Sequence, residues 1–218
     1  HKRYADVLIF EKGSQLNKYL KKMRNYFFSI IIIPVSTPQN FLDLQYKKLK
    51  PNTVSIGNDV SIRVDNSASP LFYKFAEPKT YSEISVDGKV NIESKLSLEE
   101  KDTYFQLGVV YEGSYKPGWI VRSILPEWLF KILNINKKYG VGNIDFFHVT
   151  GQDYNMDKVE NIRAIKMNFK TYGSLDQDNH FAFSAKLKPK KVLGLWLRSD
   201  ADDHKAKFET LIKSLIIK

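Results

Sequence analysis

The last part of the chain, residues 192–217, constrains the fold more than any other segment. An apolar run that begins at Val192 leads into the acidic segment 200–203, and a second apolar run fills 208–217. Two apolar runs of strand length on either side of a polar turn are typical of neighbouring antiparallel strands. The segment therefore predicts a strand, an acidic turn and a second strand, and the turn could hold a cation, bind a ligand or be a solvated hairpin end.

Similar runs fill the chain from residue 53 onward, and turn residues separate them. The dipeptide Asp87-Gly88 predicts a tight two-residue hairpin. One helix is well signalled, beginning after Pro126, where a first-turn proline is tolerated. Many short strands with little helix predict an all-β antiparallel sandwich or jelly roll. The candidate strands are 53–56, 60–64, 71–75, 81–86, 90–93, 103–111, 144–149, 162–172, 180–187, 192–198 and 208–217.

The first forty residues stand apart from this pattern. Basic residues around Met23 precede a short apolar run at 26–35, which is the form of a secretory leader that starts at Met23. The run is too short to cross a bilayer, so no transmembrane span is expected. The other interpretation is a helical segment followed by a core strand at 30–33. Both remain open, and we divide the chain into an N-terminal segment, 1–40, and a β-sandwich domain, 41–218.

The net charge limits the partners that the chain can bind, and the cysteine content limits its chemistry. The chain has 34 Lys and Arg against 24 Asp and Glu, a net charge of +10, which favours anionic partners. The basic residues are mostly scattered singly and no aromatic-basic RNA-binding motif occurs, so we expect no nucleic acid. The chain has no cysteine, which excludes disulfides, thiolate catalysis and cysteine-bound zinc.

Several short phrases together resemble an uncharacterised bacterial family of envelope or secreted proteins with a galactose-binding-like jelly roll. The resemblance covers about residue 52 to the end, and Ala201 stands where that family usually has glycine in the acidic turn. It implies a sugar-binding-like fold and a periplasmic or secreted location, with the cytoplasm still open, and it carries no catalytic residues. The phrases are NSAS at 66–69, LGVVYEG at 107–113, PEW at 126–128, GLW at 194–196, DADD at 200–203 and KF at 207–208.

The acidic turn is the only metal-site candidate that we select from the sequence. Asp200, Asp202 and Asp203 offer carboxylate oxygens of the kind that calcium binds, but calcium takes six to eight oxygens and the spacing is not that of an EF-hand. The alternative is a turn whose carboxylates face water or pair with nearby basic residues. We prefer this alternative and expect no cofactor, with calcium as the ion to test.

A ligand site is predicted around Trp119. Tyr115, Lys116, Trp119 and Arg122 lie in or beside a segment rich in turn residues, and sugars stack on exposed aromatic rings while accepting hydrogen bonds from basic side chains. The alternative places the tryptophans in the core, which we prefer for Trp128.

An enzymatic alternative uses His148 as a base with Tyr154 and Arg122, as in a polysaccharide lyase on a β-sandwich. The short motifs of that lyase class are missing, so a structural histidine is the preferred interpretation. The signatures of serine hydrolases, zinc proteases and nucleotide-binding enzymes are also missing.

The first hypothesis is therefore an envelope-associated, non-catalytic protein that binds a glycan, with acidic glycans favoured by the net charge. The alternatives are a polysaccharide-degrading enzyme and a protein interaction module that packs onto another envelope protein.

Overall fold

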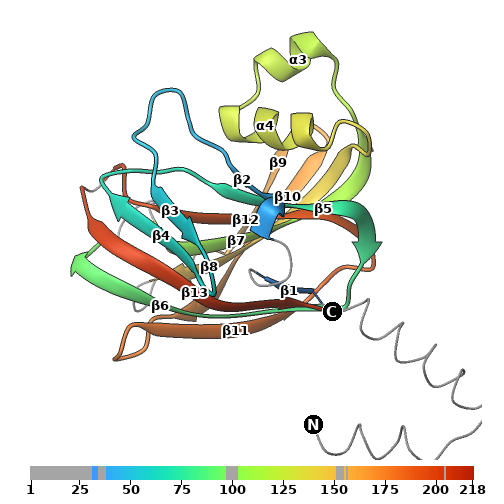
Figure 1. The fold of residues 1–218 in the computed structure, drawn as a ribbon. Coiled ribbons are helices and arrows are strands. Elements are labelled where there is room, and N and C mark those ends of the chain that lie inside the picture. The colour runs from blue at the N-terminus through green and yellow to red at the C-terminus, as the bar shows by residue number, and fades with distance from the viewer. Residues whose placement is uncertain (1–30, 34–37, 97–102, 151–154, 156, 204) are drawn as a thin grey trace, which may run out of the picture.

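The structure is a computed structural model, and it describes residues 31–33, 38–96, 103–150, 155, 157–203 and 205–218. Two sheets pack face to face (Figure 1). One has the order β11-β6-β13-β4-β3, with β1 also paired to β13, and the other has the order β2-β5-β12-β7-β8-β10-β9. The predicted all-β sandwich is confirmed.

The elements of the first sheet are β1 (Ile31–Ile33), β3 (Thr53–Ile56), β4 (Val60–Asp65), β6 (Glu83–Ser94), β11 (His180–Lys186) and β13 (Lys207–Ile217). Those of the second are β2 (Phe41–Asp43), β5 (Leu71–Thr80), β7 (Thr103–Tyr115), β8 (Val141–Thr150), β9 (Lys158–Ile162), β10 (Ile165–Ser174) and β12 (Lys191–Asp200). Between β7 and β8 lie α3 (Trp119–Ser123) and α4 (Glu127–Ile135), and a short 3-10 turn, η1 (Pro38–Asn40), precedes β2.

The predicted strand, acidic turn and strand are present, but the turn does not close a hairpin, which was one interpretation of it. Strand β12 pairs with β5 and β7 in one sheet, while β13 pairs with β4, β6 and β1 in the other. The turn therefore carries the chain from one layer of the sandwich to the next. Strand β12 is buried on both faces, one in the core between the sheets and the other in the outer cluster, which explains its continuous apolar run. Strand β13 alternates between buried and more exposed positions, as a strand with one covered face does.

The predicted hairpin at Asp87-Gly88 is also wrong, because β6 runs through both residues. A Cβ atom at position 88 would lie 2.4 Å from the Phe181 ring and 2.7 Å from the Leu211 carbonyl oxygen. Gly88 is therefore explained by close packing within the sheet rather than by a turn. The predicted strand 162–172 divides at Arg163, which has a positive φ of 57°, into β9 and β10.

The predicted helix after Pro126 is confirmed as α4, which buries Leu129, Ile132 and Leu133. The preceding helix α3 was not predicted. At the N-terminal end, β1 agrees with the core-strand interpretation of 30–33, and the expectations for residues 1–30 fall outside the described part of the chain. In the described part, no helix has the length and apolar character that crossing a membrane requires.

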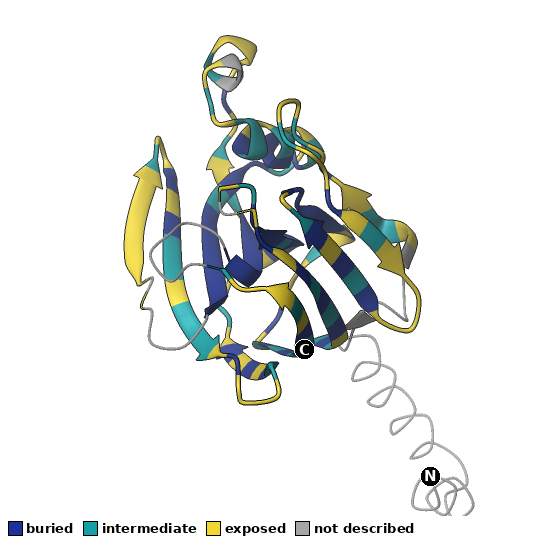
Figure 2. Cartoon of the chain, turned by 90° about the vertical axis from the view of Figure 1, so that its left-hand side faces the viewer, coloured by how far each residue is buried: buried dark blue, intermediate teal, exposed yellow. Residues whose placement is uncertain are grey.

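The buried apolar side chains form two clusters, and the buried stretches of the chain are dark blue in Figure 2. The larger one fills the space between the sheets and contains Ile62, Phe105 and Phe208. The smaller one lies on the outer face of the seven-stranded sheet, beneath α4, and contains Phe72 and Trp196. Helix α4 therefore covers part of that outer face, and the site described below lies beside this helix.

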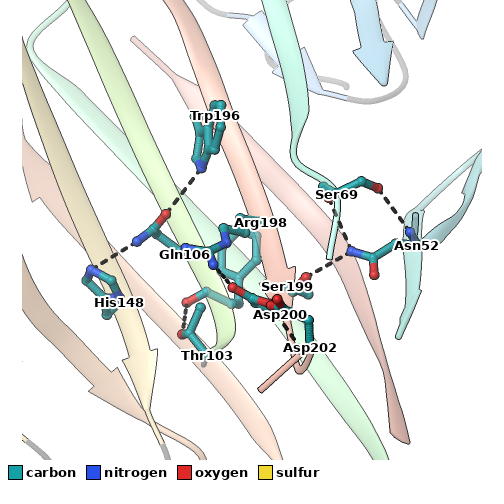
Figure 3. Close-up of polar contacts among 11 residues, drawn as sticks. Asn52, Ser69, Thr103, Gln106, His148, Trp196, Arg198, Ser199, Asp200 and Asp202 are labelled. Carbon is teal, nitrogen blue, oxygen red and sulfur yellow. Dashed lines mark hydrogen bonds and ion pairs between the residues drawn. The ribbon is translucent and has the colours of Figure 1, made fainter. Parts of the chain in front are cut away.

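A buried asparagine fastens the end of β12 to the segments around it (Figure 3). The Asn52 side-chain amide donates to the carbonyl oxygen of Ser199 at 2.8 Å and to that of Ser69 at 3.2 Å, and its oxygen accepts from the Ser67 hydroxyl at 2.7 Å. Asn66 turns the chain with a positive φ of 49°. The phrase NSAS thus has a structural explanation.

Candidate functional site

A row of aromatic side chains crosses the outer face of the seven-stranded sheet. In the strand register Trp196 of β12 lies opposite Gly108 of β7, which lies opposite Phe146 of β8, which lies opposite Phe169 of β10. The rings of Phe146 and Phe169 stack with centroids 4.9 Å apart and an interplanar angle of 17°. Trp128 of α4 closes the row, because its ring meets that of Trp196 edge-on at 5.8 Å.

Gly108 allows this row to form. A Cβ atom at position 108 would lie 2.9 Å from Cε1 of Phe146 and 2.9 Å from Cβ of Trp196. Contacts this short force a neighbour to move, so a larger residue would push the two aromatic side chains apart across β7.

A polar row runs beside the aromatic one, two positions away on each strand. Arg198 lies opposite Gln106, which lies opposite His148, which lies opposite Thr171. The indole N–H of Trp196 donates to Oε1 of Gln106 at 3.2 Å, so the two rows are joined (Figure 3).

The Gln106 side chain determines which ring nitrogen of His148 carries the proton. Its oxygen is taken by Trp196, so its amide nitrogen faces Nε2 of His148 at 3.2 Å. An amide nitrogen only donates, so Nε2 accepts and the imidazole proton lies on Nδ1. Burial, reinforced by the positive charges of Arg198 and Lys158, lowers the pKa of His148 to about 4. The ring is 1% exposed and neutral at pH 7.

Arg198 and Asp200 form an ion pair at the end of β12. The Asp200 side chain is 0% exposed, and that of Arg198 is 27% exposed. The backbone N–H of Asp202 donates to Oδ1 of Asp200 at 3.5 Å. The pair therefore fixes the acidic turn at the edge of the polar row.

A cavity of about 690 Å³ lies over the two rows, and we call it the outer-face cavity. Its floor contains Trp196, Phe146, Phe169, Gln106 and His148, and α4 contributes Trp128. The segment 46–49, β9 and the acidic turn form the remaining walls. The charged groups in the lining balance, with four basic and four acidic side chains: Lys47, Lys48, Lys158 and Arg198 against Glu127, Glu160, Asp202 and Asp203.

The wall formed by 46–49 is tied to α4. The backbone N–H of Lys47 donates to the Glu127 carboxylate at 3.3 Å, and Lys131 pairs with the same carboxylate at 3.5 Å. Burial raises the pKa of Tyr46 to about 12, so its hydroxyl stays protonated at neutral pH and can donate to a ligand. These contacts hold the wall in place without a ligand.

Of the side chains predicted to bind ligand, Tyr115, Lys116 and Trp119 are not among those that line the outer-face cavity. Trp119 is 79% exposed on α3, Tyr115 packs against the outer cluster at the end of β7, and Lys116 donates to the carbonyl oxygen of Lys138 at 2.8 Å. Arg122 belongs to α3, but its side chain is outside the described part, as is Tyr154. Neither the ligand prediction nor the catalytic one is tested by these positions.

The three carboxylates of the acidic turn lie in different surroundings. Asp202 and Asp203 line the outer-face cavity, whereas Asp200 is buried against Arg198. Within the described residues, no cluster of three or more His, Asp or Glu side chains is arranged to hold a metal ion. Calcium binding stays a prediction.

Comparison with known proteins does not assign the chain to a family. No protein-family model matches it, and no curated protein matches it. Among solved structures, the enzymatically active domain of tailspike protein 4 of bacteriophage CBA120 aligns over 84% of this chain at 6% identity with a TM-score of 0.38, and this chain spans 20% of that one.

Two smaller structures align over most of both chains. A mutant of a family 29 carbohydrate-binding module covers 87% of this chain and 91% of its own, at 9% identity and a TM-score of 0.37. The xyloglucanase domain of NopAA, a type three effector from Sinorhizobium fredii, in complex with cellobiose, covers 83% and 95%, at 8% identity and a TM-score of 0.41. All three TM-scores are low, and we base no functional statement on them.

Proposed function

We propose that this chain is a non-catalytic carbohydrate-binding sandwich and that its ligand occupies the outer-face cavity. The observation that carries the proposal is the pair of rows on the cavity floor, one aromatic and one polar, joined by the bond from Trp196 to Gln106. Sugar rings have apolar faces that pack on aromatic side chains and hydroxyl groups that need hydrogen-bond partners at the edge. In this cavity the half-buried rings of Phe169 and Trp128 offer aromatic surface and the part-exposed Arg198 offers hydrogen-bond donors. The other floor side chains are 1–4% exposed and support these contacts from beneath, and they are Trp196, Phe146, Gln106 and His148.

The size of the cavity supports the same function. Its volume of about 690 Å³ falls in the range of small-molecule sites, roughly 300–1,000 Å³. A second hollow of about 380 Å³ lies on the other sheet, among Ser85, Asp87 and Ser184. That hollow is smaller and has Phe183 as its one aromatic lining residue, so we place the sugar in the outer-face cavity.

The charge of the glycan is a separate question. The net charge of +10 supports an acidic polymer, whereas the lining of the cavity is balanced. We propose that a glycan unit binds in the cavity and that acidic groups elsewhere on the polymer meet the basic surface. An envelope or secreted location is part of the same proposal, because such polymers lie outside the cell.

The lyase-like alternative receives less support from the described residues. A catalytic base must reach its substrate, and the His148 ring is 1% exposed with its Nε2 already bonded to Gln106. Binding without reaction is therefore the function that the geometry favours.

The test compares two tryptophan variants on a panel of neutral and acidic glycans, with binding measured by calorimetry. Trp128→Ala removes a half-buried ring from the cavity wall, so we expect affinity to fall by about tenfold or more. Trp119→Ala is the matched control, because this exposed ring lies outside the cavity, and its affinity should be unchanged.

The opposite pattern, with binding lost only in Trp119→Ala, would show that the site is the one predicted from the sequence. Binding equal to the parent in both variants would contradict the outer-face cavity. Thermal unfolding of both variants must be recorded, because Trp128 also packs on Trp196. Release of sugar product on the same panel would establish an enzyme instead.

A further inference from the structure

An apolar tip projects from the sandwich at α3 (Figures 1 and 2). It consists of Trp119, Ile120 and Ile124, whose side chains are 79%, 62% and 66% exposed. Three of the seven exposed large apolar side chains of the described residues thus fall within six consecutive positions. A contiguous apolar surface of this kind marks an interaction site more often than scattered single residues do.

The chain on both sides of the tip is anchored. Tyr115 before it and Leu125 after it pack against the outer apolar cluster. Beyond Leu125, α4 buries three side chains in the same cluster. The tip is therefore held away from the sheet by fixed ends.

Three exposed lysines lie where the chain enters the tip and where it leaves α4, and we call Lys116, Lys137 and Lys138 the basic collar. The Lys116 ammonium donates to the carbonyl oxygen of Lys138 at 2.8 Å, which brings the end of β7 and the segment after α4 together. The two nearest acidic residues in the sequence are engaged elsewhere, since Glu112 pairs with Lys191 at 3.8 Å and Glu127 with Lys131 at 3.5 Å. Among the described residues, no ion pair joins a collar lysine to an acidic side chain.

We propose that the tip and collar dock this protein onto the surface of an anionic phospholipid bilayer. Trp and Ile side chains would enter the boundary between headgroups and acyl chains, and the collar lysines would lie at the phosphates. The proposal is independent of the glycan site.

The positive charge of the basic collar favours a bilayer over a second copy of the chain as the partner of the tip. Two copies packed tip to tip would bring two lysine collars together, and like charges across an interface oppose association. An anionic bilayer instead complements the collar, and each lysine near such a surface adds about 1 kcal/mol of attraction. An apolar tip that carries a Trp and has exposed lysines beside its base therefore fits an anionic lipid surface.

The experiment uses the full chain and vesicles of phosphatidylcholine with or without phosphatidylglycerol. We expect co-sedimentation with the anionic vesicles and little with pure phosphatidylcholine, and release on raising the salt from about 0.1 M to about 1 M, which shortens the screening length from about 10 Å to about 3 Å. Lipids brominated near the headgroup should quench the fluorescence of Trp119.

Two sets of variants localise the contact. Trp119→Ala with Ile120→Ala should weaken vesicle binding by about tenfold or more, and Val159→Ala, an exposed apolar side chain on β9, should not. Changing the three collar lysines to Gln should weaken binding to anionic vesicles. The matched control, Lys166, Lys170 and Lys186 to Gln, carries the same net charge and should bind like the parent.

Binding to neutral vesicles as strong as to anionic ones would overturn the proposal, as would equal loss in the two lysine sets. Self-association that disappears in the tip variant, without vesicle binding, would identify a second copy as the occupant and overturn it. Loss of glycan binding on Trp119→Ala, with vesicle binding absent, would overturn it in favour of a sugar contact. Because the tip side chains are exposed, the midpoint of thermal unfolding should be the same in the tip variants as in the parent. Recording it shows directly whether a variant fails to fold.

Discussion

Replacing Arg198 with alanine should lower the free energy of unfolding by about 3–5 kcal/mol. The substitution leaves the carboxylate of Asp200, which is 0% exposed, without its ionic partner. A buried charge that loses its partner keeps the full cost of having left water, so the loss is much larger than for a surface pair. Chemical denaturation of the parent and the variant measures the difference.

The matched control is Arg63→Ala. Arg63 lies 3.9 Å from Glu209 and is 65% exposed, so its removal should cost less than about 1 kcal/mol. Adding Asp200→Asn to the Arg198→Ala variant should recover much of the loss, because the stranded charge is gone. If Arg198→Ala costs no more than Arg63→Ala, the buried ion pair is not what fixes the end of β12.

Acid should destabilise the protein through His148 by about 3 kcal/mol between pH 7 and pH 4. The pKa of His148 is about 4 in the folded protein and 6.5 in the reference state. Between these values the unfolded chain binds the proton and the folded chain does not, so unfolding is favoured as the pH falls. The loss begins near pH 6.5 and is complete near pH 4, where the folded protein is protonated as well.

The measurement is the free energy of unfolding against pH for the parent and for His148→Gln. Glutamine keeps an acceptor for the Gln106 amide but does not titrate, so the variant should lose the part of the slope between pH 6.5 and pH 4. His180→Gln, at a partly exposed position on β11, is the matched control and should keep the parent slope. A parent and a His148→Gln variant with the same slope would contradict the buried, neutral histidine.

The sandwich could be predicted because alternation within each strand is a local property. Val60, Ile62 and Val64 are buried as their spacing requires, and so are Leu195 and Leu197. Which strands become neighbours is not local. The acidic turn joins two sheets rather than a hairpin, and β8 pairs in parallel with β10, a pairing that no turn signal announces.

The outer-face cavity was missed for the same reason. Phe146 with His148, and Trp196 with Arg198, each share a face at a spacing of two residues, which the sequence displays. Their alignment into two rows depends on the register of four strands. Trp128 was interpreted as a core residue from the apolar face of its helix, and it is half-buried because α4 covers only part of the sheet.

The position of the two late strands has a consequence for how the chain folds during synthesis. Strand β12 lies inside one sheet and β13 inside the other, and both come after all the strands with which they pair. Neither sheet can close around its centre until these strands have left the ribosome. Contacts between partners so distant in sequence make folding slow, and the emerging strands keep unpaired edges until then. The nascent chain therefore depends on protection from aggregation until positions 191–217 have emerged.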